Sequence, residues 1–156
     1  MYVNGIETPI IVDDYFPVKY GQPAFCNTNS EELWGMIMEK AWAKLHGSYS
    51  RVEGGQTAHA SQHVIGLPAL TFDHKDAAQD IDSLWKKLKI FDKRNFVILS
   101  SSPPGGNDKT VNGIVQGHAY SLLSVHEINA YGRNWRLVKM RNPWGRKGEW
   151  DGEWSD

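Results

Sequence analysis

Two residues of this chain have the types and spacing for hydrolytic chemistry. A histidine stands in Gly117-His118-Ala119-Tyr120, and an asparagine follows 24 residues later in Arg141-Asn142-Pro143-Trp144. In a Cys-His-Asn triad the imidazole deprotonates a thiol, and the amide fixes the tautomer and orientation of the ring. We therefore expect His118 to be a general base and Asn142 its orienting partner.

The third member of such a triad has no good candidate. Cys26 is the only cysteine, and its neighbours are Ala24-Phe25 and Asn27-Thr28. A catalytic thiolate needs a helix N-terminus or a cation to lower its pKa, and Cys26 precedes the next predicted helix by several residues. We expect Cys26 to be structural, so that the pair has no nucleophile within this chain.

The residues after Asn142 favour a fixed geometry. Pro143 restricts Asn142 to an extended backbone. Trp144 can then cover the His118–Asn142 hydrogen bond, which strengthens as the local dielectric falls.

A predicted hairpin brings the two residues together. Residues 119–126 alternate between two largely apolar faces, which is typical of a central strand, residues 131–134 form a turn, and residues 135–141 form the returning strand. His118 at the start of one strand and Asn142 at the end of its antiparallel neighbour should therefore lie side by side.

Other segments give weaker predictions. Residues 10–12 indicate a strand. A helix follows, for which Asn29 or Ser30 can be the N-cap, with Glu31 and Glu32 in the first turn. Gly47 can be the C-cap of this helix. That helix is apolar around much of its circumference and should be mostly buried. Gly54-Gly55 resembles a hinge, followed by a loop over residues 56–62.

The second half of the chain has a similar pattern. Asp76 can cap a helix whose apolar face includes Ile81, Leu84, Trp85 and Leu88. Residues 96–99 are predicted to form a buried strand, and residues 100–112 a long exposed loop.

Composition excludes several functional classes. The chain has 156 residues, of which 40% are hydrophobic and 22% charged, with a net charge of −1, so no basic excess indicates nucleic-acid binding. No apolar run reaches the roughly 18 residues of a membrane span. A single cysteine and no visible secretory signal predict an intracellular, cytoplasmic protein.

Four motifs, in order, resemble the calpain family of cysteine proteases. They are Val12-Asp13-Asp14 with Pro17; Leu33-Trp34 with Glu39-Lys40-Ala41 and residues 43–49; residues 117–121 with 137–145; and the ending Glu149-Trp150-Asp151-Gly152-Glu153-Trp154-Ser155-Asp156. The resemblance is weakest over residues 58–80 and 100–112.

The resemblance implies a papain-like α+β fold, with part of a helical first lobe in residues 1–54 and most of a second lobe with an antiparallel sheet in residues 55–156. It implies a calcium-dependent endopeptidase that hydrolyses peptide bonds in proteins, with His118 as base, Asn142 as orienter and Trp144 gating the cleft. It also implies calcium ligands at Glu32, Glu149 and Asp156, where carboxylates suit a hard cation.

The chain also departs from the family pattern. The family's nucleophile belongs to a Gly-x-Cys-Trp stretch that would precede this chain, so we expect residues 1–156 to need the remainder of the protease polypeptide and to be inactive alone. An extra residue before Glu149 weakens that ligand assignment. Glu32 is equally well explained as a residue of a helix first turn, and Glu149 and Asp156 as solvated charges.

Two alternatives stay open. In the first, the chain is a non-catalytic, calpain-like module that binds peptides or has a regulatory role. His59 and His63, with three residues between them, have a spacing seen in metal sites, although the glutamate of a His-Glu-x-x-His motif and a third ligand are not evident.

Overall fold

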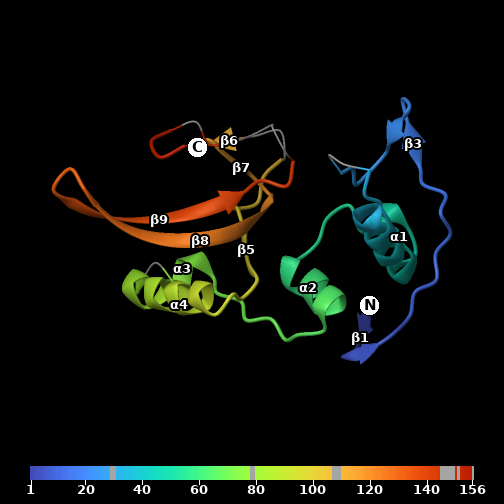
Figure 1. Ribbon diagram of the computed structural model, residues 1–156, viewed down its shortest axis with the longest axis horizontal. Helices are drawn as coiled ribbons and strands as arrows, with labels where there is room; N and C mark the ends of the chain where they lie inside the picture. The colour runs from blue at the N-terminus through green and yellow to red at the C-terminus, as the bar shows by residue number, and fades with distance from the viewer. Residues whose placement is uncertain (29–30, 78–79, 107–109, 145–149, 151, 156) are drawn as a thin grey trace. The chain divides into compact units, whose positions relative to one another are not determined.

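The computed structural model describes residues 1–156 except 29–30, 78–79, 107–109, 145–149, 151 and 156 (Figure 1). The chain divides into two compact units, Met1–Leu70 and Thr71–Asp156. Both contain helices and short or long antiparallel strands, so the α+β class is confirmed. The predicted lobe boundary at residue 54 falls inside the first unit and stays a prediction.

The first unit consists of two short hairpins followed by helices. Its elements are β1 (Tyr2–Val3), β2 (Ile6–Glu7), β3 (Val18–Lys19), β4 (Gln22–Pro23), α1 (Trp34–His46), the 3-10 helix η1 (Tyr49–Arg51) and α2 (Thr57–Ile65). Within the described residues of the whole chain, no helix has the length and apolar composition needed to cross a membrane.

Helix α1 ends as predicted but starts later. Gly47 follows it with φ of +101°, the left-handed conformation that a glycine C-cap adopts. The first helical residue is Trp34, so the placement of Glu31 and Glu32 in the first turn was wrong. The Glu32 carbonyl accepts the Thr28 hydroxyl at 2.8 Å, so this carbonyl is hydrogen-bonded outside the helix. Asn29 and Ser30, the predicted caps, lie outside the described residues.

We had expected helix α1 to be buried around most of its circumference, but it buries only one face. Met36, Ala41 and Ala43 are buried, whereas Trp34 and Ile37 are exposed. Its stripe of apolar residues is therefore wider than the surface that packs.

Residues 10–12 do not form the predicted strand. Their β-branched side chains favour extended backbone, but the backbone is held by lysines instead of by a neighbouring strand. Lys44 Nζ donates to the Ile11 carbonyl at 2.6 Å, and Lys40 Nζ contacts Asp13 and the Tyr15 carbonyl. A pattern of side chains cannot reveal that helix lysines replace a strand partner.

Helix α2 occupies the segment predicted to be a loop. Residues 57–65 are helical and end at Gly66, which has φ of +71°. A Cβ at Gly66 would lie 2.6 Å from the Tyr2 ring, so the helix end closes tightly on β1. None of its residues is fully buried, which explains why the sequence shows no helical apolar period.

The second unit is built around a long hairpin. Its elements are α3 (His74–Ala77), α4 (Ile81–Lys93), β5 (Ile98–Ser101), β6 (Thr110–Val111), β7 (Ile114–Val115), β8 (Ala119–Ala130) and β9 (Arg133–Arg141). Strands β5, β8 and β9 form an antiparallel sheet in that order, which confirms the hairpin and the central position of β8. The predicted loop 100–112 includes the end of β5 and all of β6.

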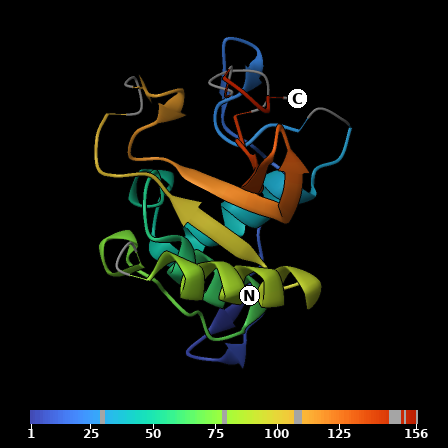
Figure 2. The same ribbon diagram turned by 90° about the vertical axis from the view of Figure 1, so that its left-hand side faces the viewer.

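Helix α4 lies along one face of this sheet (Figures 1 and 2). Trp85 is buried and donates from Nε1 to Glu127 Oε1 of β8 at 2.6 Å. Asp92 Oδ2 accepts the Val125 N–H at 3.1 Å, close to a register shift between Leu122 and Ser124. The helix thus supplies a hydrogen bond to the strand next to its irregularity.

Two predictions about the ends of elements in this unit were wrong. Asp80, not Asp76, caps α4, because its carboxylate accepts the Ser83 N–H at 2.9 Å. The buried strand predicted at 96–99 starts at Ile98, while Phe96 and Val97 are 51% and 68% exposed. Phe96 stacks on Phe91 of α4 instead, with ring centroids 5.3 Å apart.

Candidate active site

The hairpin brings His118 and Asn142 to the same end of the sheet. His118 directly precedes β8 and Asn142 directly follows β9, and Ser121 pairs with Arg141 close to this end. His118 Nε2 lies 2.8 Å from Asn142 Oδ1. The proximity expected from topology is therefore present in the structure.

The hydrogen bonds of the Asn142 amide determine the tautomer of His118. Asn142 Oδ1 also accepts the backbone N–H of Trp144 at 3.1 Å, which marks this atom as the amide oxygen. An amide oxygen only accepts, so His118 Nε2 must be the donor. The lone pair of the neutral ring is then on Nδ1, to which no described residue of the chain hydrogen-bonds. Nδ1 can accept a proton, which is what a general base requires.

The backbone of His118 is fixed by the end of β5. Ser102 N–H donates to the His118 carbonyl at 2.9 Å, and Ser102 Oγ accepts the His118 N–H at 2.9 Å and donates to its carbonyl at 3.2 Å. Ser102 was not among the residues predicted from the sequence. No local pattern marks it, because its role depends on how β5 pairs with β8.

Gly117 is required immediately before the histidine. It has φ of +59°, and a Cβ there would lie 2.4 Å from the Gly105 carbonyl oxygen. Gly117 N–H donates to the Pro103 carbonyl at 2.7 Å. The loop 102–106 therefore packs against the entry to β8 so closely that only glycine fits.

Aromatic rings enclose the imidazole. His118 is 9% exposed; the Trp144 ring lies 4.3 Å from it, and the Tyr120 ring meets it edge-on at 5.0 Å. Tyr120 is itself held, because its hydroxyl accepts the Val115 N–H at 3.0 Å. Trp144 is 44% exposed and so separates the His118 ring from solvent on one side. A hydrogen bond in such an environment is stronger than one in water.

Comparison with known proteins assigns the family. The family model described as "Calpain family cysteine protease" matches residues 1–156. This chain belongs to the calpain family. The α+β structure is that of a fragment of a papain-like calpain domain, and the resemblance drawn from the sequence motifs is confirmed.

Named relatives agree with this assignment. "Calpain-type cysteine protease DEK1" of Arabidopsis thaliana is 41% identical, over 99% of this chain and 7% of the relative. "Calpain-A" of Drosophila melanogaster is 35% identical, over 94% of this chain and 18% of the relative. "Calpain-14" of Homo sapiens is 37% identical, over 97% and 22%. The chain thus spans less than a quarter of the length of each of these relatives.

Cys26 belongs to the first unit and has an acidic neighbour. Its backbone N–H donates to Glu39 Oε2 at 2.9 Å, and its Sγ packs close to Gly35. Partial burial raises the pKa of the Cys26 thiol, and the Glu39 carboxylate raises it further. Both effects disfavour a thiolate, the opposite of what a calpain nucleophile needs.

Of the three residues suggested as calcium ligands, only Glu32 lies within the described residues; Glu149 and Asp156 do not. Glu32 Oε2 accepts the indole N–H of Trp34 at 3.1 Å. Among the described residues, no group of three or more acidic, histidine or cysteine side chains could hold a metal ion.

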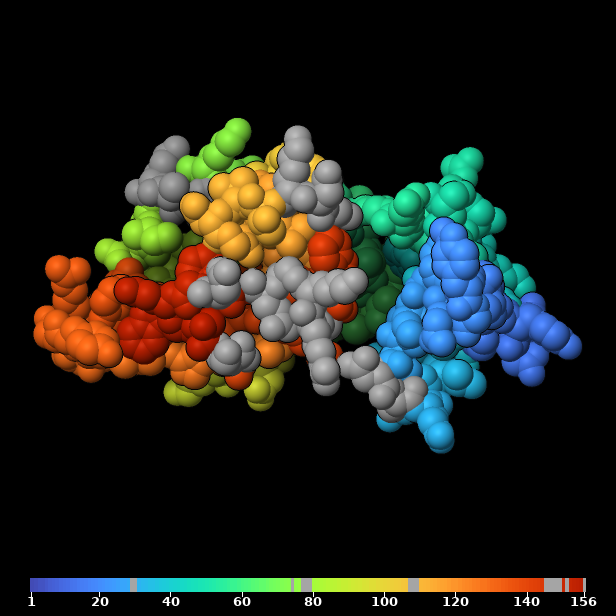
Figure 3. Space-filling model, turned by 90° about the horizontal axis from the view of Figure 1, so that it is seen from above, coloured from blue at the N-terminus to red at the C-terminus, as the bar shows by residue number. Residues whose placement is uncertain are grey.

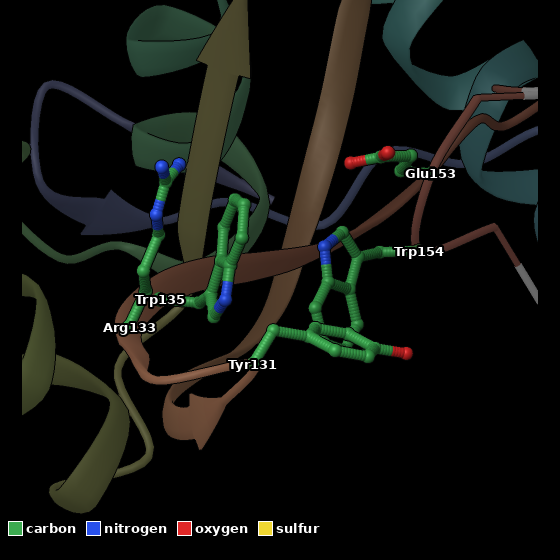
Figure 4. Close-up of a pocket in the computed structure, with 5 residues that line it drawn as sticks. All are labelled: Tyr131, Arg133, Trp135, Glu153 and Trp154. Atoms are coloured by element: carbon green, nitrogen blue, oxygen red, sulfur yellow. The ribbon is translucent and has the colours of Figure 1, made fainter.

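A pocket of about 610 Å³ lies at the end of the β8–β9 hairpin that is opposite to His118 and Asn142. Tyr131, Arg133, Trp135, Glu153 and Trp154 line it (Figure 4). The described C-terminal residues, red in Figure 3, lie against the orange hairpin, with the Trp135 and Trp154 rings 5.8 Å apart. The pocket is separated from His118 by the full length of β8, so it is not part of the histidine site.

Proposed function

We propose that His118 and Asn142 are the general base and the orienting residue of a calcium-dependent cysteine endopeptidase that hydrolyses peptide bonds in proteins. The hydrogen bond between His118 Nε2 and Asn142 Oδ1 is the observation that carries the proposal. It leaves Nδ1 as the basic atom on a buried, well-held ring. In this proposal the nucleophilic thiol comes from outside residues 1–156.

The reaction follows from this arrangement. His118 Nδ1 takes the proton of the thiol, and the thiolate attacks the carbonyl carbon of the scissile peptide bond. The amide oxygen of Asn142 stabilises the imidazolium that forms. The imidazolium then gives its proton to the leaving amine, and His118 later activates the water that hydrolyses the acyl-enzyme.

Trp144 has a protective role in this proposal. Its indole lies against the His118 ring, and its backbone N–H binds the same oxygen that orients the ring. Both contacts resist rotation of the imidazole during proton transfer. A side chain at the edge of the cleft can also control how substrate reaches the ring.

Cys26 is structural in this proposal. The Glu39 carboxylate beside it would repel both a thiolate and an acyl-enzyme oxyanion. Replacing Cys26 with serine should therefore leave the activity of the complete enzyme unchanged, whereas replacing a nucleophile would abolish it.

Calcium dependence is a further part of the proposal, in which the Glu32 carboxylate would be one oxygen ligand of a calcium ion. No step of the reaction is assigned to calcium, which would act in assembling the lobes. An intracellular location fits the single cysteine, since a reducing compartment needs no disulfide.

A non-catalytic peptide-binding module is the alternative. The aromatic pocket at the hairpin turn is the observation that favours it, because tryptophan and tyrosine commonly line peptide sites. The fixed tautomer of His118 favours the protease, since a binding module has no use for a basic Nδ1.

Proteolysis of a labelled casein tests the two functions. The expected results are no cleavage by residues 1–156 alone, cleavage by the complete polypeptide with its natural upstream segment, and a loss of about 10²- to 10⁴-fold in kcat/KM for His118→Ala in that polypeptide. His126→Ala is the control, because His126 lies on the same strand with its Nε2 on Ser124. Cleavage by 1–156 alone that requires Cys26 would contradict the assignment of the nucleophile, and an inactive complete polypeptide would favour the binding module.

A further inference from the structure

Two histidines of the first unit meet at the ends of their helices. His46 is the last residue of α1, and His63 is in the last turn of α2. Their ring centroids lie 5.6 Å apart, and the Trp42 ring contacts both, at 4.2 Å from His46 and 5.0 Å from His63. The spacing of His59 and His63 had suggested a metal-binding pair, but the structure brings the His63 ring next to His46 of the other helix.

The hydrogen bond of His63 leaves one nitrogen ready to bind a metal. His63 Nδ1 lies 2.9 Å from the His59 carbonyl oxygen. A carbonyl only accepts, so Nδ1 carries the hydrogen and Nε2 carries the lone pair. Histidines that ligate metals usually donate their other ring N–H to a carbonyl or carboxylate in this way, which fixes the tautomer and raises ligand basicity.

The separation of the rings suits one shared ion. With metal–nitrogen distances of about 2.0–2.1 Å, the centroids of two imidazoles on a tetrahedral ion lie roughly 5 to 6 Å apart. The observed 5.6 Å is within this range. His46 is exposed and His63 is half-buried, so an ion could reach them from solvent.

We propose that His46 and His63 form a binding site for a divalent transition-metal ion that prefers nitrogen ligands, such as Zn²⁺, Cu²⁺ or Ni²⁺. Imidazole ligands favour these ions over Ca²⁺, which takes oxygen ligands. Within the described residues no third His, Cys, Asp or Glu completes the group, so water fills the other coordination positions. The site is separate from the calcium dependence proposed above.

Metal binding here would cross-link the two helices. The ion joins the C-terminal end of α1 to that of α2 and closes the intervening segment 47–62 into a loop. Because the ion binds the folded form, in which the two rings are close, and not the unfolded chain, binding raises the stability of the folded form. The first unit should therefore unfold at higher urea concentration when Zn²⁺ is present.

Calorimetric titration of the 156-residue chain with Zn²⁺ tests the site, and histidine NMR spectra locate it. His46→Gln and His63→Gln should each weaken binding at least tenfold, and the His46 and His63 ring signals should shift together in the unsubstituted chain. His59→Gln is the matched control, because His63 hydrogen-bonds the backbone carbonyl of His59, which the substitution keeps, and the affinity of this variant should stay within twofold. Ca²⁺ in place of Zn²⁺ should shift neither ring.

Four results would overturn the proposal. One is an affinity within twofold of the unsubstituted chain in His46→Gln. Another is loss of binding in His59→Gln, which would locate the site along α2 alone. The third is Zn²⁺ that shifts the signals of other histidines while those of His46 and His63 stay in place. Circular dichroism of each variant shows whether the chain has kept its helices, and a folded His63→Gln that binds Zn²⁺ normally contradicts the site without reference to His46.

Discussion

His118 Nε2 lies 2.8 Å from Asn142 Oδ1, and the same oxygen accepts the Trp144 backbone N–H. The asparagine thus orients the imidazole while its own oxygen is oriented by the chain that follows it. Pro143 stands between the two anchored residues and limits the backbone of Asn142. The geometry therefore involves both the local stiffness of the chain at Pro143 and the pairing of β8 with β9.

Replacing Asn142 should release the tautomer of His118. In Asn142→Leu no amide oxygen faces Nε2, so the ring should sample both neutral tautomers, whereas the unsubstituted chain should hold the hydrogen on Nε2. Nitrogen-15 NMR of the imidazole above pH 8 distinguishes the two. Asn134→Leu is the control, because Asn134 lies at the far end of the hairpin. An unchanged Nε2–H signal in Asn142→Leu would contradict the proposed role of the amide.

Ser102 should contribute to stability through the backbone of His118. Ser102→Ala removes a hydroxyl that accepts the His118 N–H at 2.9 Å. Leaving this part-buried donor without its partner should lower the free energy of unfolding by about 1–2 kcal/mol, measured by urea denaturation. Ser101→Ala, at an exposed position one residue earlier, should change it by less than about 0.5 kcal/mol. Equal effects of the two substitutions would mean that the hydroxyl contact is unimportant.

Gly117 and Gly132 form a matched pair for testing the loop behind His118. Both have positive φ, +59° and +71°, but a Cβ at Gly117 would meet the Gly105 oxygen at 2.4 Å, whereas one at Gly132 would meet nothing within 4 Å. Gly132→Ala should cost about 1–2 kcal/mol, the left-handed backbone penalty. Gly117→Ala should cost more than this and should shift the His118 NMR signals. Equal unfolding free energies for the two variants would show that the loop moves away freely.

The proximity of His118 and Asn142 was predictable because the sequence patterns that indicate it are local or belong to one hairpin. His118, Asn142, Pro143 and Trp144 lie within or beside two strands whose alternation and turn residues are visible in the sequence. An antiparallel hairpin then leaves little freedom in which ends meet. The elements that hold the site from outside the hairpin, Ser102 and Gly105, could not be predicted in the same way.

The wrong predictions share a physical cause. Residues 10–12 are bonded by lysines of α1, and α2 is a helix with no buried residue. Lysine contacts from α1 replace a strand partner for residues 10–12, and a helix that buries no residue needs no apolar stripe, so neither structure leaves a periodic pattern in the sequence. The start of α1 was misplaced because acidic residues before a helix look the same as acidic residues in its first turn.

Glu127 should contribute to the pH dependence of the unfolding free energy of the second unit. The Lys89 ammonium and then the Trp85 indole N–H hold the pKa of Glu127 below its ordinary value of 4.5. Because the folded pKa is the lower one, this stabilisation is fully present above pH 4.5 and is lost as the pH falls through the folded value. Glu127→Gln should therefore flatten the decline in unfolding free energy between pH 5 and about pH 3. Exposed Glu53→Gln is the control, and identical pH profiles for Glu127→Gln and the unsubstituted chain would contradict the linkage.

Trp144 should protect the hydrogen that His118 shares with Asn142. The indole lies 4.3 Å from the imidazole, and His118 is only 9% exposed. In Trp144→Ala water gains access to Nε2, so the Nε2 hydrogen should exchange several-fold faster, which the broadening of its NMR signal measures. Trp154→Ala is the matched control, since Trp154 is 46% exposed against 44% for Trp144 but packs on Trp135 at the other end of the hairpin. The exchange rate should be unchanged in that variant. Equal exchange rates in Trp144→Ala and the unsubstituted chain would contradict the shielding role of the indole and leave Tyr120 as the aromatic ring in contact with His118.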